Sequence, residues 1–302
     1  MLAATATSFS GWTFMGHPGL LYRDGFQYAY ASFYAITIPF TGVMFLKKQW
    51  MLGKHYGYVT PGEMFADYFK SDAIRVLVVI VALFFSIPYL GVQLRSSGFL
   101  FNVLTEGLFS VNVGMWMLSI VVFVYVASGG LRAVAYVDTV QCLLLAGGIT
   151  AIGLIGVSYA GGWGALNEGI ANLVSLDKKL TPDGYSHYIA IPGVIQFVKS
   201  GPSAVGGAWT GIMILSYAFA LMGIQSSPAF SMWSFANKNP KPFAPQQVWA
   251  SSLGIGGILI FFTAMQAFSG HLLGADSKML EAGFAKDVMK LGMDLLQTPG
   301  KQ

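Results

Sequence analysis

A run of small and hydroxyl-bearing residues interrupts the apolar segment Met1–Gly19. These residues are Thr5, Thr7, Ser8, Ser10 and Gly11. A helix is weak where β-branched and hydroxyl residues precede a glycine, and its freed carbonyls can replace the water around a cation. Lipid tolerates such a turn only where it is buried in protein or lines a cavity. The segment therefore predicts a broken helix that forms an ion and solute site, or a packing face where small residues let helices approach closely.

A second polar interruption lies far along the chain, at Gly223–Pro228 between two apolar stretches. Pro228 removes a backbone donor, and Gln225, Ser226 and Ser227 are costly in lipid, so we expect them to face the protein interior. The alternative is a proline kink whose serines bond to their own backbone. Two interrupted spans are typical of a transporter built from inverted repeats with a site near the membrane midplane.

We expect the breaks at Thr5–Gly11 and Gly223–Pro228 to face one another around one pocket, because each frees backbone groups that lipid cannot satisfy. Trp12 and Tyr89 are candidate walls of this pocket, although an aromatic residue in a membrane helix also serves ordinary packing. Gln93, one helical turn beyond Tyr89, is a candidate because a glutamine in mid-span needs a polar partner.

The composition indicates a membrane protein with several helical spans. The 302 residues are 55% hydrophobic and 10% charged, whereas soluble proteins carry roughly 25% charged residues. The apolar runs are continuous, unlike the short alternating segments of a membrane barrel. The single cysteine, Cys142, lies in an apolar run, which excludes a disulfide framework and a cysteine-based metal cluster.

We predict six complete spans after a partial first one. These are Phe26–Leu46, Ile74–Gly98, Val111–Ser128, Val140–Tyr159, Trp209–Ser231 and Trp249–Phe268. We expect residues 17–19 to end the first span, Pro88 to break the second complete one, and Gly129–Asp138 to form a tight loop. His17 and His271 fall at predicted span ends, which indicates an interfacial position for both.

Short helices are predicted in the connecting segments. Thr60 is suited to an N-cap and Pro61 to a first helical position, so we expect an amphipathic helix over Pro61–Phe69. Two more short helices are expected in the long loop, around Ala165–Leu173 and Gly193–Lys199.

Basic residues predict the orientation in the membrane, because cytoplasmic loops are rich in lysine and arginine. One side collects Lys47, Lys48, Lys54, Lys70, Arg75, Arg132, Lys238 and Lys241. This side is expected in the cytoplasm of a bacterial cell, which places the loop 161–206 and the tail 270–302 outside the cytoplasmic membrane. The chain starts inside an apolar span, so we expect residues 1–302 to be one transporter domain that is incomplete at both ends.

Three stretches resemble the sodium/solute symporter family, which includes bacterial sodium/proline and animal sodium/glucose carriers. The first is Ala6–Trp12 together with Met15–Gly19, and the second is Thr60–Phe69. The third, Gly129–Gln141 with the sequence GGLRAVAYVDTVQ, is the most specific. The order and spacing of these stretches match the family along the whole chain.

The resemblance implies a core of two inverted five-helix repeats, with broken first and sixth core helices and alternating access. It also implies that the backbone carbonyls of Ala6 and Phe9 bind sodium, together with hydroxyls of an eighth core helix that lies beyond this sequence. Ser8 stands where sodium/proline carriers have an aspartate, so the solute is not carried over from them.

These observations favour sodium-coupled symport of a small organic solute, with Na+ as the coupling ion and no other cofactor. No aspartate or glutamate falls in the middle of a predicted complete span, which favours sodium over protons. The sequence has none of the common enzyme motifs, and its basic residues lie in loops, which argues against catalysis and nucleic-acid binding. A channel, or a symporter-like sensor domain of a signalling histidine kinase, is the alternative; a kinase segment in the full-length gene would indicate the sensor.

Overall fold

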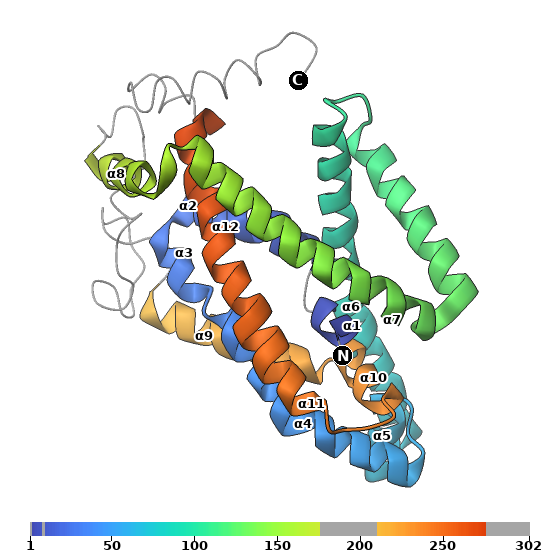
Figure 1. Ribbon diagram of the computed structural model, residues 1–302. Helices are drawn as coiled ribbons and strands as arrows, with labels where there is room; N and C mark the ends of the chain where they lie inside the picture. Colours follow the sequence, from blue (N-terminus) through green and yellow to red (C-terminus); the bar gives the residue numbers. More distant parts are fainter. Residues whose placement is uncertain (1, 8–9, 176–209, 276–302) are drawn as a thin grey trace.

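The computed structural model describes residues 2–7, 10–175 and 210–275, and within them every regular element is a helix (Figure 1). Five helical segments in this part of the chain are long and apolar enough to cross a membrane. The expectation of an all-α membrane protein is confirmed.

The helix α7 (Val111–Tyr159) replaces two of the predicted spans. Its 49 residues would extend roughly 74 Å if straight, more than twice the ~30 Å hydrocarbon thickness of a bilayer. It reverses at Gly130, whose φ of 55° and ψ of −152° are open to glycine and strained for other residues. Figure 1 shows the two arms of α7 meeting at a sharp corner, and each arm corresponds to one predicted span.

Two predicted interruptions are wrong. The loop expected over Gly129–Asp138 is reduced to the single reversal at Gly130, because the residues that follow continue at once as helix. Pro88 does not break α6 (Asp72–Leu104), which runs through it without interruption. The proline removes one backbone bond only, and long apolar helices in membranes tolerate that loss.

The first span is broken but longer than expected. It consists of α1 (Leu2–Ala6), the π-helical turn η1 (Trp12–Gly16) and α2 (His17–Asp24). The predicted end at residues 17–19 is wrong because the proline there falls in the first turn of α2, where its missing N–H is not needed. The helix ends at Gly25, which has a φ of 64°.

The next helices lead to the polar end of the molecule. A turn separates α3 (Phe26–Ala31) from α4 (Tyr34–Tyr56), which continues beyond the predicted span. The predicted helix α5 (Pro61–Phe69) is confirmed, with Thr60 as its N-cap. The Thr60 hydroxyl accepts from the Glu63 N–H at 3.3 Å, and the Glu63 carboxylate accepts from the Thr60 N–H at 3.2 Å, which forms a capping box.

The second broken span is also present. It consists of α9 (Gly211–Met222), the 3₁₀ turn η3 (Gly223–Ser226) and α10 (Pro228–Ala236). The chain then continues through α11 (Phe243–Pro245), the π-helical η4 (Gln246–Gly256), α12 (Gly257–Gly270) and η5 (His271–Ala275). The short helix predicted near residue 165 is confirmed as α8 (Gly162–Ser175), whereas the one expected over 193–199 lies outside the described residues.

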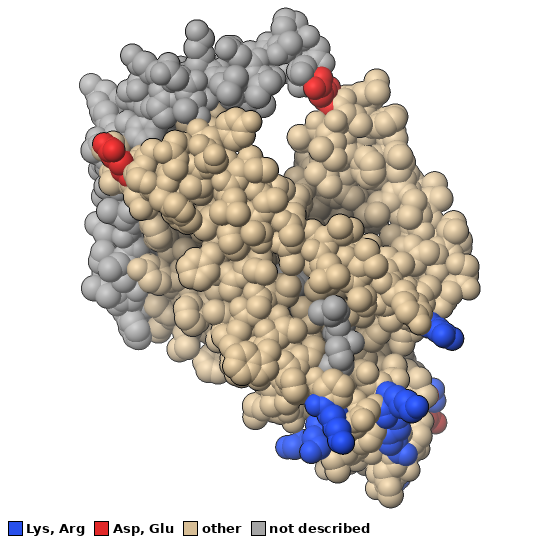
Figure 2. Space-filling view, viewed as in Figure 1, with Lys and Arg blue, Asp and Glu red and all other residues tan. Residues whose placement is uncertain are grey.

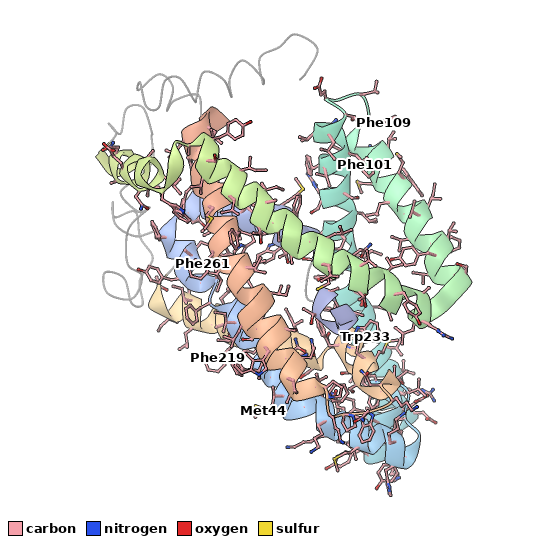
Figure 3. The ribbon with its side chains drawn as sticks, in the orientation of Figure 1. Met44, Phe101, Phe109, Phe219, Trp233 and Phe261 are labelled. Carbon is pink, nitrogen blue, oxygen red and sulfur yellow. The ribbon has the colours of Figure 1, made fainter. Side chains whose placement is uncertain are left out.

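Small residues bring α12 against the second arm of α7. A Cβ on Gly153 would lie 2.8 Å from the carbonyl oxygen of Phe262, and one on Gly156 would lie 2.4 Å from the Ser269 hydroxyl. Such close approach is typical of helices packed within membranes. Elsewhere the outer surface is apolar, and Figure 3 shows Met44 on α4, Phe219 on α9 and Phe261 on α12. These three side chains are exposed and suited to contact with lipid.

Charge is concentrated at one end of the molecule. Figure 2 shows lysine and arginine side chains gathered at the lower end, where α4 finishes and α5 lies. There Arg75 pairs with Glu63 at 3.6 Å and Lys70 with Asp67 at 2.7 Å. The backbone N–H of Val59 holds the pKa of Glu63 below its usual value. This end carries charges suited to water rather than to lipid.

Candidate ion and solute site

The break after α1 releases a backbone carbonyl from helical bonding. In a continuous helix, the N–H of Ser10 would donate to the carbonyl of Ala6. Here that N–H donates instead to the hydroxyl of Thr13 at 3.2 Å. The Ala6 carbonyl ends α1 without its helical donor, so its oxygen can serve a cation.

Gln93 on α6 contacts the end of this break that is nearer to η1, at Gly11. Its Oε1 accepts a hydrogen bond from the backbone N–H of Gly11. A Cβ on Gly11 would lie 2.5 Å from the Cβ of Ser96, so only glycine allows α6 to approach this closely. The polar partner that the sequence predicted for Gln93 is therefore the backbone of the broken first span.

The break between α9 and α10 is built differently. Ser227 is extended, with a φ of −65° and a ψ of 156°, and Pro228 begins the next helix. The carbonyl of Met222 at the end of α9 accepts from the hydroxyl of Thr41 at 2.9 Å. The same hydroxyl is 2.8 Å from the carbonyl of Ile38, so α4 offers the break one donor that is shared between two carbonyls.

A cavity of about 440 Å³ lies between the two breaks. Its lining residues are Ser10, Trp12, Thr13, Tyr34, Ala35, Ile38, Pro39, Phe85, Tyr89, Val92, Tyr217, Ala220, Leu221, Ile224, Ser251, Gly256 and Leu259. No charged side chain belongs to this set, which comes from the described residues. The cavity is large enough for a small organic molecule and offers aromatic and apolar contacts with a few hydroxyl groups.

Aromatic rings form one wall of this cavity. The ring centroid of Tyr34 lies 5.9 Å from that of Trp12 and 5.4 Å from that of Tyr217. Tilted and edge-to-face arrangements at these distances are favourable for aromatic pairs. The wall therefore joins the first broken span to α4 and α9.

His17 and His271 are both buried within the protein, with exposed fractions of 0% and 2%; their interfacial depth in the membrane stays a prediction. His17 Nδ1 is 2.9 Å from the hydroxyl of Thr263, and its Nε2 is 2.8 Å from the hydroxyl of Ser32. Both ring nitrogens thus have polar partners, which offset the free-energy cost of burying the imidazole ring. The continuation of the first span through α2 is what brings His17 into the interior.

The structure separates the residues predicted for one shared pocket. Ser10, Trp12 and Tyr89 line the cavity. Gln225 is buried in a second, smaller pocket, so the expectation of one shared pocket is wrong for this residue. Gln225 is not among the residues that line the cavity, although the neighbouring Ile224 is.

The remaining predicted site residues differ in their surroundings. Ser226 is exposed and Ser227 is half-buried at the start of α10. Ser8 and Phe9 lie outside the described residues, so of the two carbonyls implied for sodium only that of Ala6 is described.

Sequence reasoning did not identify the polar residues of η4. Gln246 Nε2 donates to the hydroxyls of Thr5 at 2.6 Å and Ser251 at 2.7 Å, and these hydroxyls are 2.9 Å apart. Ser251 also lines the cavity. The signal was available in the sequence, since Gln246 and Gln247 are polar residues next to a predicted apolar span and Ser251 is a polar residue within it.

Comparison with known proteins assigns the fold to a family. The profile of the sodium:solute symporter family matches residues 1–205. The chain belongs to this family. Together with the five apolar helical segments, this makes it a multi-pass integral membrane protein.

Individual relatives are distant in sequence. An uncharacterised symporter of Bacillus subtilis is 22% identical over 236 residues, covering 78% of this chain and 44% of that protein. The sodium/pantothenate symporter of Escherichia coli is 29% identical over 222 residues, 72% of this chain and 44% of the symporter. The sodium/proline symporter of Escherichia coli is 27% identical over 172 residues, 54% of this chain and 33% of the symporter.

The chain therefore spans less than half the length of these relatives. No solved structure matches it significantly.

Proposed function

We propose that this chain is part of a sodium-coupled secondary transporter that moves a small organic solute across a bacterial cytoplasmic membrane by alternating access. The observation that carries the proposal is the cavity of about 440 Å³ between two broken spans, the first of which contains a backbone carbonyl, that of Ala6, without its helical donor. Family membership and the names of the sodium symporters it resembles support the same reading.

In this proposal the carbonyls of Ala6 and Phe9 supply oxygen ligands to Na+. Neutral oxygens are suitable, because sodium is a hard monovalent cation and the negative C-terminal end of a helix dipole favours a positive charge. Among the described residues no group of three or more histidine, cysteine, aspartate or glutamate side chains could hold a metal ion. A sodium site here would therefore depend on backbone and hydroxyl oxygens.

The solute would bind in the cavity against Trp12 and Tyr89, with Ser10 as a hydrogen-bonding partner. Because no charged side chain lines the cavity among the described residues, an ionised group on the solute would have to be balanced by backbone dipoles or by Na+ itself. We propose that the solute presents an apolar body to the aromatic wall.

The two breaks would begin the two inverted five-helix repeats, with the basic end of the molecule in the cytoplasm. The loop 161–206 and the tail 270–302 would then lie outside. The lysine and arginine side chains gathered at that end in Figure 2 support this topology.

Uptake by the full-length protein in proteoliposomes tests the proposal. A panel of labelled amino acids, carboxylates, vitamins and sugars should reveal at least one solute whose uptake requires an inward sodium gradient. The same uptake in a gradient of choline is the control. Uptake that does not depend on the sodium gradient would overturn the proposal. Binding of a solute without transport would also overturn it and would favour a sensor.

A further inference from the structure

Two glutamines from separate elements meet in a small pocket apart from the cavity. Gln225 of η3 is 1% exposed and Gln247 of η4 is 2% exposed. The pocket that both line has a volume of about 10 Å³. A space of roughly this size holds one water molecule only where polar groups can bind it, and the amides of Gln225 and Gln247 are such groups.

Hydrogen bonds fix the direction in which the Gln247 amide points. Gln246 Nε2 donates to the Thr5 and Ser251 hydroxyls, which leaves its Oε1 to accept from Gln247 Nε2 at 2.7 Å. An amide has donors on one side and an acceptor on the other. With its nitrogen turned to Gln246, Gln247 directs its oxygen elsewhere.

That oxygen converges with Gln225 on the backbone of Gly42. A Cβ on Gly42 would lie 2.7 Å from Gln247 Oε1 and 3.1 Å from Gln225 Oε1. Neither oxygen has a hydrogen-bond partner among the described residues, and neither does Gln225 Nε2. Leaving buried amide atoms unsatisfied is destabilising. A water molecule has two hydrogens and two lone pairs. It can therefore donate to both oxygens and accept from Gln225 Nε2.

We propose that one water molecule binds between Gln225 and Gln247 and completes a hydrogen-bonded relay between the two broken spans. The relay runs from Thr5 at the first break through Gln246, Gln247 and the water to Gln225 at the second. The N–H donor of Gln225 favours water over a cation, which would use only the oxygens. Gln246 and Gln247 are then positioning residues, because they act on the ion site through Thr5.

A density map of the full-length protein, at a resolution that shows ordered water, tests the site directly. We expect a peak within hydrogen-bonding distance of the amides of Gln225 and Gln247, in sodium buffer and in choline buffer alike. A direct amide-to-amide hydrogen bond with no peak overturns the proposal. A peak that is present only in sodium also overturns it, in favour of a cation site.

Gly42→Ala tests whether the relay affects sodium-dependent uptake. This test rests on the proposed transport function. The added methyl group occupies the position beside Gln247 Oε1 and pushes the amide out of the pocket. We expect the sodium concentration for half-maximal uptake to rise about fivefold, the factor that corresponds to about 1 kcal/mol for one hydrogen bond. Gly19→Ala is the matched control, because a Cβ there meets nothing within 4 Å.

Gln247→Leu should shift the sodium dependence in the same direction without adding a clash. Its control is Gln266→Leu, since Gln266 is also within a span but donates to the carbonyl of Ile149, outside the relay. Unchanged sodium dependence in both Gly42→Ala and Gln247→Leu overturns the relay. If the unmodified protein shows no sodium-dependent uptake, the proposed function fails, whereas the density map still decides whether the water is bound.

Discussion

The indole Nε1 of Trp233 donates a hydrogen bond to the hydroxyl of Thr7 at 2.9 Å, which joins the second broken span to the first. Thr7 donates its own hydroxyl proton to the carbonyl of Ala3 at 3.0 Å. Its oxygen is therefore free to act only as an acceptor toward Trp233. This bond holds the end of α1, where the carbonyl of Ala6 lies.

Trp233→Phe should weaken this link while keeping an aromatic ring in place. We expect a loss of about 1 kcal/mol in stability, since one hydrogen bond is removed. We also expect a higher sodium concentration for half-maximal uptake, because the end of α1 carries the proposed ion ligand. Thermal unfolding in detergent and uptake over a sodium series measure the two effects.

Trp50→Phe provides the control for that experiment. Trp50 Nε1 donates to the carbonyl of Asn237, also at 2.9 Å, but this bond does not involve the first break. The control should lose similar stability and keep its sodium dependence. Equal shifts of the sodium dependence in both variants would contradict the role given to Trp233.

Gln93→Leu should affect the first break from the side of α6. The substitution leaves the N–H of Gly11 without its acceptor, and an unsatisfied buried donor costs about 1–3 kcal/mol. We expect uptake to be largely lost while the protein still inserts in the membrane. Gln93→Glu retains an oxygen acceptor and should keep more activity than the leucine variant; the opposite order would argue against this hydrogen bond.

The sequence was sufficient to locate both breaks, because their cause is local. Hydroxyl residues before Gly11, and the residues 223–227 before Pro228, weaken a helix wherever it is placed. The capping box at Thr60 is local in the same way, and it was predicted correctly. Pro88 shows the limit of this reasoning, since a long apolar helix absorbed the loss of one backbone bond.

The partners of each break could not be predicted from the sequence, because they depend on distant elements. Thr5 bonds to residues more than 240 positions away, and Gln225 shares a pocket with Gln247 rather than lining the cavity. The periodicity of an apolar span does not indicate which polar side chains on different helices will form hydrogen bonds with one another. The same limit explains why the sequence did not indicate the partners of His17, which are the hydroxyls of Ser32 and Thr263.

Gly130→Ala should disrupt the reversal that divides α7. At a φ of 55° and a ψ of −152°, a side chain strains the backbone by about 1–3 kcal/mol. We expect a lower unfolding temperature in detergent and reduced yield in the membrane. Gly148→Ala on the second arm of α7, where a Cβ meets nothing within 4 Å, should leave both unchanged; equal losses in the two variants would refute the importance of the backbone conformation at Gly130.

The orientation in the membrane makes a prediction that is independent of transport. If the basic end shown in Figure 2 faces the cytoplasm, residue 241 lies inside the cell and residue 178 lies outside. The experiment starts from Cys142→Ala, which removes the one native cysteine. We expect a membrane-impermeant thiol reagent to label Lys178→Cys in intact cells and to label Lys241→Cys only after the cells are opened. The reverse pattern would invert the topology, and it would place the ends of α4 and α5 outside the cell.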